Sequence, residues 1–123
     1  MRRNAVGWFE IYVQDMTRAR QFYETVFGAP LSRLNSPDLE MWAFPMEIDD
    51  PGSAGALVHV PGVPSGGNSV MIYFSCEDCA VEGGRVAGAG GKVERDKMSI
   101  GEYGFIVLAR DTEGNMIGLH SMQ

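Results

Sequence analysis

The chain has 123 residues, of which 45% are hydrophobic and 21% are charged, so a disordered chain is excluded and one globular domain is expected. Ten Lys and Arg against sixteen Asp and Glu give a net charge of −6, which argues against nucleic acid or an anionic membrane as a partner. No apolar stretch is long enough to span a membrane, and two cysteines are too few for a disulfide framework. These features predict a cytoplasmic protein with no secretory signal.

The first half of the chain predicts a strand, a helix and three further strands. Apolar and polar side chains alternate over residues 8–13 with the period of a strand. Asp15 is the expected N-cap of a helix over Met16–Phe27, and Gly28 is the expected stop. Turn-forming residues then separate short expected strands at 30–34, 39–46 and 54–60.

The second half of the chain repeats this order after a linker over residues 61–68 that is rich in Pro and Gly. A strand is expected at 70–75, and Asp78 is the expected cap of a second helix, from Cys79 to about Ala89. Further strands are expected near 92–95, 105–110 and 116–121.

The two halves keep the same spacing between their landmarks. The expected caps Asp15 and Asp78 are 63 residues apart, and so are the expected helix stops Gly28 and Gly91. Two copies of one βαβββ unit explain this repeat. We therefore predict a single domain over 1–123, made of a first module at 5–60, the linker at 61–68 and a second module at 69–123.

The repeat predicts an α+β fold in which the two βαβββ modules form a curled mixed sheet, or cup, with the helices on its outer face. In each opening strand the helix-facing side chains are apolar, whereas the opposite face mixes aromatic and polar groups. This mixture suits a small-molecule cavity, and a core between two subunits is the alternative. The residues on these opposite faces are Trp8, Glu10 and Tyr12 in the first module and Met71, Tyr73 and Ser75 in the second.

Two stretches of the chain are distinctive: EIYVQDMTRARQFYETVFG at residues 10–28 and DTEGNMIGLHS at residues 111–121. They resemble the opening and the closing hairpin of the vicinal-oxygen-chelate superfamily, which includes glyoxalase I, the bleomycin-resistance proteins and the extradiol dioxygenases. Residues 55–58 and 73–75 are similar to its glyoxalase-related subgroup of small uncharacterised proteins. The resemblance covers nearly the whole chain and implies the fold and a homodimer. It implies no single reaction, because members differ widely in chemistry.

The resemblance also implies where a metal would be held, because metal-dependent members place His, Gln or Glu at four cup-facing positions. The corresponding residues of this chain are Trp8, Met71, Gly118 and Ala56. Trp, Gly and Ala side chains offer no suitable ligand atom, and a thioether sulfur is too soft for a hard or borderline divalent ion. We therefore expect no metal site and no cofactor, and we do not expect glyoxalase I or dioxygenase activity.

Glu10 and His120 are the candidate catalytic residues. Each lies two residues beyond one of these positions, so strand alternation keeps both on the cup face. A carboxylate and an imidazole that meet in a cavity can act as general base and acid, or as two ligands of an incomplete metal site. The alternatives are a structural hydrogen bond between them and an exposed His120 at the end of the chain.

Two other groups of side chains have both a functional and a structural interpretation. Trp42 and Phe44 lie in an apolar stretch and are predicted to form a hydrophobic wall of the cup, with the core or a subunit interface as the alternative. Cys76 and Cys79 have the spacing of a redox motif, but small buried thiols are expected at these positions.

Three functions are open. We predict a metal-independent protein that binds a small, partly apolar organic molecule in the cup. The alternatives are a lyase or isomerase of the glyoxalase-related type, which would use Glu10 and His120 or a metal held by other ligands, and a structural role in which the cup is unused. The predicted lining residues are Trp8, Tyr12, Trp42, Phe44, Met71, Tyr73 and Gly118.

Overall fold

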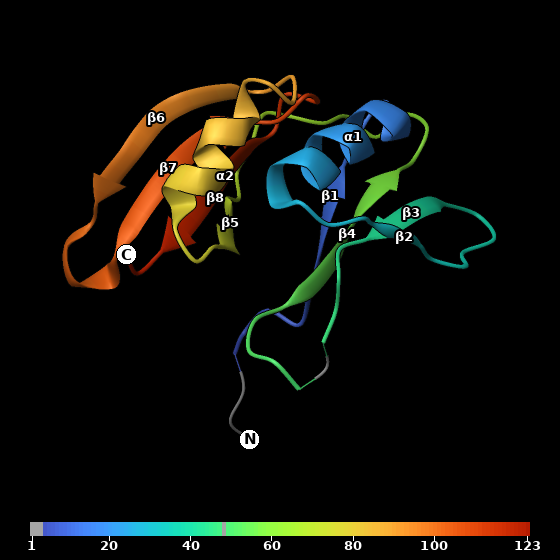
Figure 1. Ribbon diagram of the computed structural model, residues 1–123. Coiled ribbons are helices and arrows are strands. Elements are labelled where there is room, and N and C mark those ends of the chain that lie inside the picture. The colour runs from blue at the N-terminus through green and yellow to red at the C-terminus, as the bar shows by residue number, and fades with distance from the viewer. Residues whose placement is uncertain (1–3, 48) are drawn as a thin grey trace.

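The computed structural model describes residues 4–47 and 49–123. The first module contains β1 (Trp8–Tyr12), α1 (Met16–Phe27), β2 (Ser32–Arg33), β3 (Glu40–Ala43) and β4 (Ala54–His59). The second contains β5 (Ile72–Ser75), α2 (Cys79–Val86), β6 (Lys92–Ser99), the short 3-10 helix η1 (Gly101–Tyr103), β7 (Phe105–Arg110) and β8 (Met116–Ser121). Figure 1 shows the two modules side by side. The prediction of an α+β fold built from two βαβββ modules is confirmed.

Each module forms its own four-stranded mixed sheet. The strand orders are β1-β4-β3-β2 in the first module and β5-β8-β7-β6 in the second. In both sheets the first and last strands of the module pair in parallel, and the remaining pairs are antiparallel. This topology makes β1 and β5 edge strands of their sheets.

The predicted helix caps are confirmed. Asp15 accepts a hydrogen bond from the amide of Arg18, and Asp78 accepts one from the amide of Ala80, both at 3.0 Å. Gly28 ends α1 with a φ of 67°, a left-handed conformation that favours glycine. In residues 4–47 and 49–123, no helix is long and apolar enough to span a membrane.

Several element boundaries differ from the prediction. Strands β2, β3 and β5 are shorter than the expected strands at 30–34, 39–46 and 70–75. The second helix ends at Val86 rather than near Ala89, and a turn with Gly90 at a φ of 96° follows it. Strand β6 continues to Ser99, although its expected end was Arg95. Its pairing with β7 shifts register on both sides of Arg95, so bulges interrupt the alternation from which a strand is predicted.

The helix-facing sides of the two sheets share one hydrophobic core. Phe74 of β5 lies among Phe9, Phe27 and Phe44 of the first module, with ring centroids 4.6 to 6.0 Å from its own. The two helices also contact each other. Because aromatic side chains bury large apolar areas, this cluster holds the modules together and fixes the edge of one sheet relative to the other.

Candidate ligand-binding site

Three side chains project from the face of β1 that is opposite the helices. The carboxylate of Glu10 accepts a hydrogen bond from the indole Nε1 of Trp8 at 3.3 Å and another from the hydroxyl of Tyr12 at 2.9 Å. The hydrogen bond to Glu10 raises the pKa of Tyr12, and burial and the carboxylate charge act in the same direction. Tyr12 therefore remains a hydrogen-bond donor at neutral pH. Trp8 is 39% exposed, so the group is open to a ligand.

The corresponding face of the second sheet carries an exposed tyrosine. Tyr73 pairs with Gly118 in the parallel register of β5 and β8. A Cβ built on Gly118 would lie 2.3 Å from the Tyr73 ring, so the absence of a side chain lets the ring lie over β8. Tyr73 is 49% exposed, and Met71 lies just before β5, half-buried.

Trp42 and Phe44 lie on the helix side of the first sheet, so the prediction that they line the cup is wrong. Phe44 has its ring centroid 5.3 to 5.9 Å from three other core rings. Trp42 packs beneath α1, where the guanidinium of Arg20 lies 3.5 Å from its ring centroid. The opposite face carries the small side chains Ala43 and Ala56, which are paired across β3 and β4. Side chains alternate between the two faces of the strand as predicted. Trp42 and Phe44 nevertheless lie on the helix side rather than the cup side, because they fill the space under α1.

Glu10 and His120 belong to different sheets. His120 is on the open face of β8, but its Nε2 lies 2.6 Å from the carbonyl oxygen of Tyr103 in η1. That hydrogen bond holds η1 against the end of β8. In the part of the chain that the structure describes, no hydrogen bond or ion pair joins Glu10 to His120. The two candidates therefore do not form one acid–base pair within a single chain.

A cleft of about 250 Å³ lies between the edge strands β1 and β5. This volume is slightly below the range of about 300 to 1,000 Å³ that is usual for drug-sized ligands, so the cleft suits a small molecule or part of a larger one. Among the described residues that line it, Glu10 is the only charged one. The lining consists of Glu10, Ile11, Tyr12, residues 64–70, Ile72, Asn115, Met116 and Ile117.

The linker forms one wall of the cleft and is held by the second module. The side chain of Asn68 accepts a hydrogen bond from the amide of Met116 and donates one to its carbonyl, both at 2.9 Å. The amide of Gly66 donates to the side-chain oxygen of Asn115 at 2.6 Å. These contacts hold the linker in place, so a ligand would meet a preformed wall.

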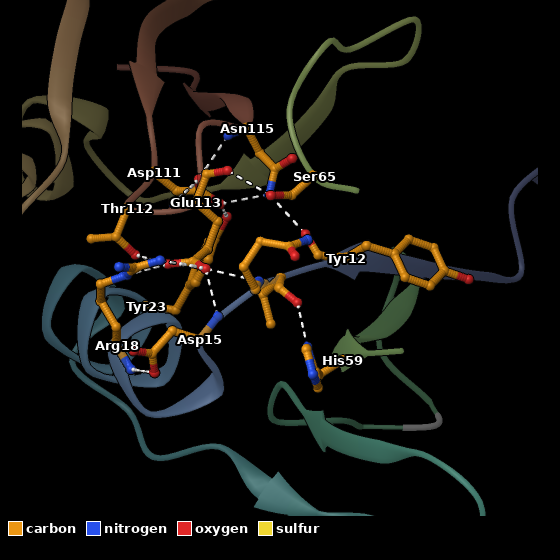
Figure 2. A network of polar contacts seen from close by, with 12 residues as sticks. Tyr12, Asp15, Arg18, Tyr23, His59, Ser65, Asp111, Thr112, Glu113 and Asn115 are labelled. Carbon is orange, nitrogen blue, oxygen red and sulfur yellow. Dashed lines mark hydrogen bonds and ion pairs between the residues drawn. The ribbon is translucent and has the colours of Figure 1, made fainter. Parts of the chain in front are cut away.

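A buried carboxylate, Glu113, fastens the β7–β8 turn to the start of α1 (Figure 2). It accepts hydrogen bonds at 2.8 Å from the amides of Gln14 and Asp15, and Arg18 donates to both of its oxygens at 2.7 and 3.0 Å. Burial alone would raise the pKa of Glu113. The hydrogen bonds from Arg18, the two amides and Thr112 outweigh burial and hold the pKa at about 2.

A second carboxylate, Asp111, organises the same turn from inside. It accepts hydrogen bonds at 2.8 Å from the amides of Glu113 and Asn115, and at 2.6 Å from the hydroxyl of Tyr23 on α1. Burial, with the charge of Asp111 and this hydrogen bond, raises the pKa of Tyr23 well above its usual value. The sequence predicts only a tight turn at 112–115. The burial of the two acids was not predicted, because it depends on distant partners: Tyr23 lies 88 residues before Asp111, and the partners of Glu113 on and before α1 lie 95 to 99 residues earlier.

The two cysteines are structural. Cys79 is fully buried and Cys76 is half-buried, and neither forms a disulfide. Burial and the neighbouring charge of Glu82 raise the pKa of the Cys76 thiol to about 12. A thiol that stays protonated at neutral pH is a poor nucleophile, which agrees with the expectation of small buried thiols.

Comparison with known proteins identifies the family to which the chain belongs. The family model of the Glyoxalase/Bleomycin resistance protein/Dioxygenase superfamily matches residues 5–119. The chain belongs to this superfamily. The resemblance noted in the sequence is thereby confirmed. A search of curated proteins finds no match to the chain.

Several solved structures share the fold of this chain. An antibiotic binding protein from Streptomyces sp. CB03234 has a TM-score of 0.73 and 23% identity, covering 100% of this chain and 99% of that one. A glyoxalase-related enzyme from Fulvimarina pelagi has a TM-score of 0.68 and 18% identity, covering 94% of this chain and 86% of that one. A glyoxalase I mutant from Zea mays has a TM-score of 0.70 and 19% identity, but only 46% of its chain is covered, against 94% of this one.

The residues at the superfamily's metal-ligand positions do not fit a divalent metal. Trp8 uses its indole nitrogen as a donor to Glu10, so this nitrogen is no ligand. The space over Gly118 is taken by the Tyr73 ring. Met71 and Ala56 supply a soft sulfur and a methyl group.

Proposed function

We propose that this protein binds a small, partly apolar organic molecule without a metal, in the cleft between β1 and β5 and on the aromatic face beside it. The cleft is the observation that carries the proposal. Its isoleucines and Tyr12 offer apolar contact, and one carboxylate offers a polar group that can orient a ligand. The exposed rings of Trp8 and Tyr73 extend the surface beyond the cleft.

Binding is favoured over catalysis by the arrangement of the candidate residues. Glu10, in the first module, is held by Trp8 and Tyr12. His120, in the second module, is hydrogen-bonded to the backbone carbonyl of Tyr103. The residues at the superfamily's metal positions support a site that works without a metal. The antibiotic binding protein among the structural neighbours supports a ligand of this class.

We further propose that the functional form is a homodimer in which the second copy faces the open sides of the sheets and encloses the ligand site without filling it. Exposed large aromatic side chains such as Trp8 and Tyr73 are typical of protein interfaces. Light scattering on purified protein is expected to give twice the chain mass of 13.4 kDa. A mass of one chain at micromolar concentration would contradict the dimer.

Trp8 provides the test of ligand binding because it is exposed on the proposed site, whereas Trp42 is packed under α1. In a Trp42→Phe variant, Trp8 is the remaining tryptophan. When a library of small aromatic compounds is titrated into this variant, some compounds should change the fluorescence of Trp8 and reach saturation. For such ligands, Tyr73→Ala should weaken binding about tenfold, since a buried aromatic contact is worth about 1.4 kcal/mol or more.

The matched control is Tyr103→Ala, which removes a tyrosine that is 69% exposed on η1, outside the site. It should leave the affinity unchanged. A library with no saturable ligand, or ligands that bind equally well after Tyr73→Ala, would contradict binding at this site.

A further inference from the structure

We infer that the cleft recognises an organic cation, whose protonated amine donates hydrogen bonds to Glu10 while its apolar part packs against Tyr12 and the cleft isoleucines. This inference rests on the proposed function, because it names the class of ligand for the same site. Four properties of the cleft support it: its charge, the acceptor sites of its carboxylate, the aromatic surface beside that carboxylate, and its preformed wall.

The charge of the cleft comes from one side chain. In residues 4–47 and 49–123, the lining contains Glu10 and no Lys, Arg or His. The ion pairs that the structure shows also leave Glu10 out. Arg18, which follows β1 closely in the chain, is held by Glu113 at 2.7 Å. A ligand that carries its own positive charge would therefore balance a carboxylate that has no ion-pair partner among the residues the structure describes.

The carboxylate keeps acceptor sites for a ligand. Trp8 donates to Oε2 and Tyr12 donates to Oε1, which accounts for one hydrogen bond on each oxygen. A carboxylate has about four acceptor sites, so about two are left. Both neighbours are donors, and the raised pKa of Tyr12 means that its hydroxyl is not lost as a donor near neutral pH. They orient the carboxylate, and its remaining lone pairs can accept from a ligand donor but repel a ligand that brings only acceptors.

Aromatic surface next to a carboxylate also suits a cation. Tyr12 is one of the residues that line the cleft, and the indole of Trp8 donates a hydrogen bond to Glu10. An ammonium group close to an aromatic face gains attraction from the electrons of the ring, in addition to its charge-assisted hydrogen bond to the carboxylate. An anionic ligand would meet repulsion from Glu10 and from a chain with a net charge of −6.

The wall opposite Glu10 is fixed before a ligand arrives. Asn68 and Gly66 tie the linker to Met116 and Asn115, as described above. Val70, which lines the cleft, is 65% exposed and offers apolar surface to a ligand. Since little ordering is required, selectivity for the amine should appear directly in the affinity.

The experiment compares three probes that share a phenyl group and differ in charge: 2-phenylethylammonium, 2-phenylethanol and 3-phenylpropanoate. Binding to the full chain is followed by amide chemical shifts, which locate each probe, and the dissociation constants come from the titrations. The ammonium probe is expected to bind about tenfold more tightly than the neutral alcohol, and the carboxylate probe more weakly than either. The chemical-shift changes caused by the ammonium probe should centre on residues 64–70 and β1.

Variants identify the group responsible. Glu10→Gln should remove the preference for the ammonium probe while leaving the affinity for the alcohol within about twofold. Tyr12→Phe should reduce the preference by a smaller factor, because the carboxylate loses one orienting donor. Glu102→Gln is the matched control, since Glu102 is exposed on η1, lies outside the cleft and changes the net charge equally. This control should keep the full preference.

The outcomes separate this inference from the proposed function. If the alcohol or the carboxylate probe binds as well as the ammonium probe, the site binds small molecules but the inference of a cation is overturned. The inference of a cation is also overturned if the Glu10→Gln variant still binds the ammonium probe more tightly than the alcohol. If no probe binds at millimolar concentration, both the inference and the proposed function are contradicted. The comparison of probes on the unmodified chain is decisive even if a variant folds poorly.

Discussion

Replacing Glu113 with Ala is expected to lower the free energy of unfolding by about 3 kcal/mol. The side chain is fully buried and accepts hydrogen bonds from two backbone amides and from both Arg18 donors. Its removal leaves those amides without their acceptor and Arg18 without its partner, and each lost buried partner costs about 1 to 3 kcal/mol. Urea denaturation followed by circular dichroism measures the change.

A matched control separates this network from the loss of one negative charge. Glu47→Ala removes an exposed carboxylate and should change the stability by less than about 0.5 kcal/mol. If Glu113→Ala were no more destabilising than Glu47→Ala, the β7–β8 turn would not depend on this carboxylate.

The same carboxylate makes the stability depend on pH in a defined window. Because the folded pKa of Glu113 is depressed to about 2 from a usual value of 4.5, its contribution is fully present above pH 4.5 and is lost as the pH falls toward 2. The contribution is about 2 to 3 kcal/mol, allowing for solvent screening at the half-exposed Arg18. Glu113→Gln, which cannot titrate, should lose less stability than the unmodified chain between pH 5 and 2.

Substituting Gly55 by Ala is the second change with a large expected effect, about 2 to 3 kcal/mol of destabilisation. A Cβ at this position would lie 2.4 Å from the ring of Phe9. That ring has Phe44 and Phe74 at centroid distances of 5.9 and 6.0 Å, so moving it disturbs the packing of the aromatic core. Thermal and urea unfolding of the Ala variant measure the cost.

Gly118→Ala is the matched comparison, because its Cβ would lie 2.3 Å from another aromatic ring, that of Tyr73. Tyr73 is 49% exposed and can turn into solvent, so the cost should be less than about 1 kcal/mol. Equal costs for the two substitutions would show that Tyr73 is held as firmly as a core residue. A neutral Gly55→Ala would show that the shared core adapts.

The elements that local signals define were predictable. Asp15, Asp78 and Gly28 act within a few residues of their own position, so their cap and stop functions follow from the sequence. The common face of Trp8, Glu10 and Tyr12 follows in the same way, because strand alternation needs only three neighbouring positions.

The assignment of Trp42 and Phe44 was not predictable by the same means. Alternation determines which side chains share a face but not which face meets the helices. That choice depends on the space under α1, where Arg20 and the aromatic core lie. Trp42 and Phe44 fill this space, and the opposite face of the strand carries Met41 and Ala43.

The cleft and the buried acids depend on contacts between the halves of the chain. Glu113 meets Arg18 across 95 positions, and residues 64–70, at the end of the linker and just after it, become a wall only when β1 and β5 lie close together. In the sequence the linker is only a stretch of Pro and Gly, and an acid in a turn is ordinarily exposed. No local pattern distinguishes Asp111 and Glu113 from solvated turn residues.

Titration of the Trp42→Phe variant with the tightest ligand from the library, before and after removal of metals by a chelator, tests the proposed function most directly. Metal-independent binding at the β1–β5 cleft predicts the same dissociation constant for both samples, measured from Trp8 emission, and no change when Ni²⁺ or Zn²⁺ is added. Loss of binding after chelation, restored by either ion, would contradict it.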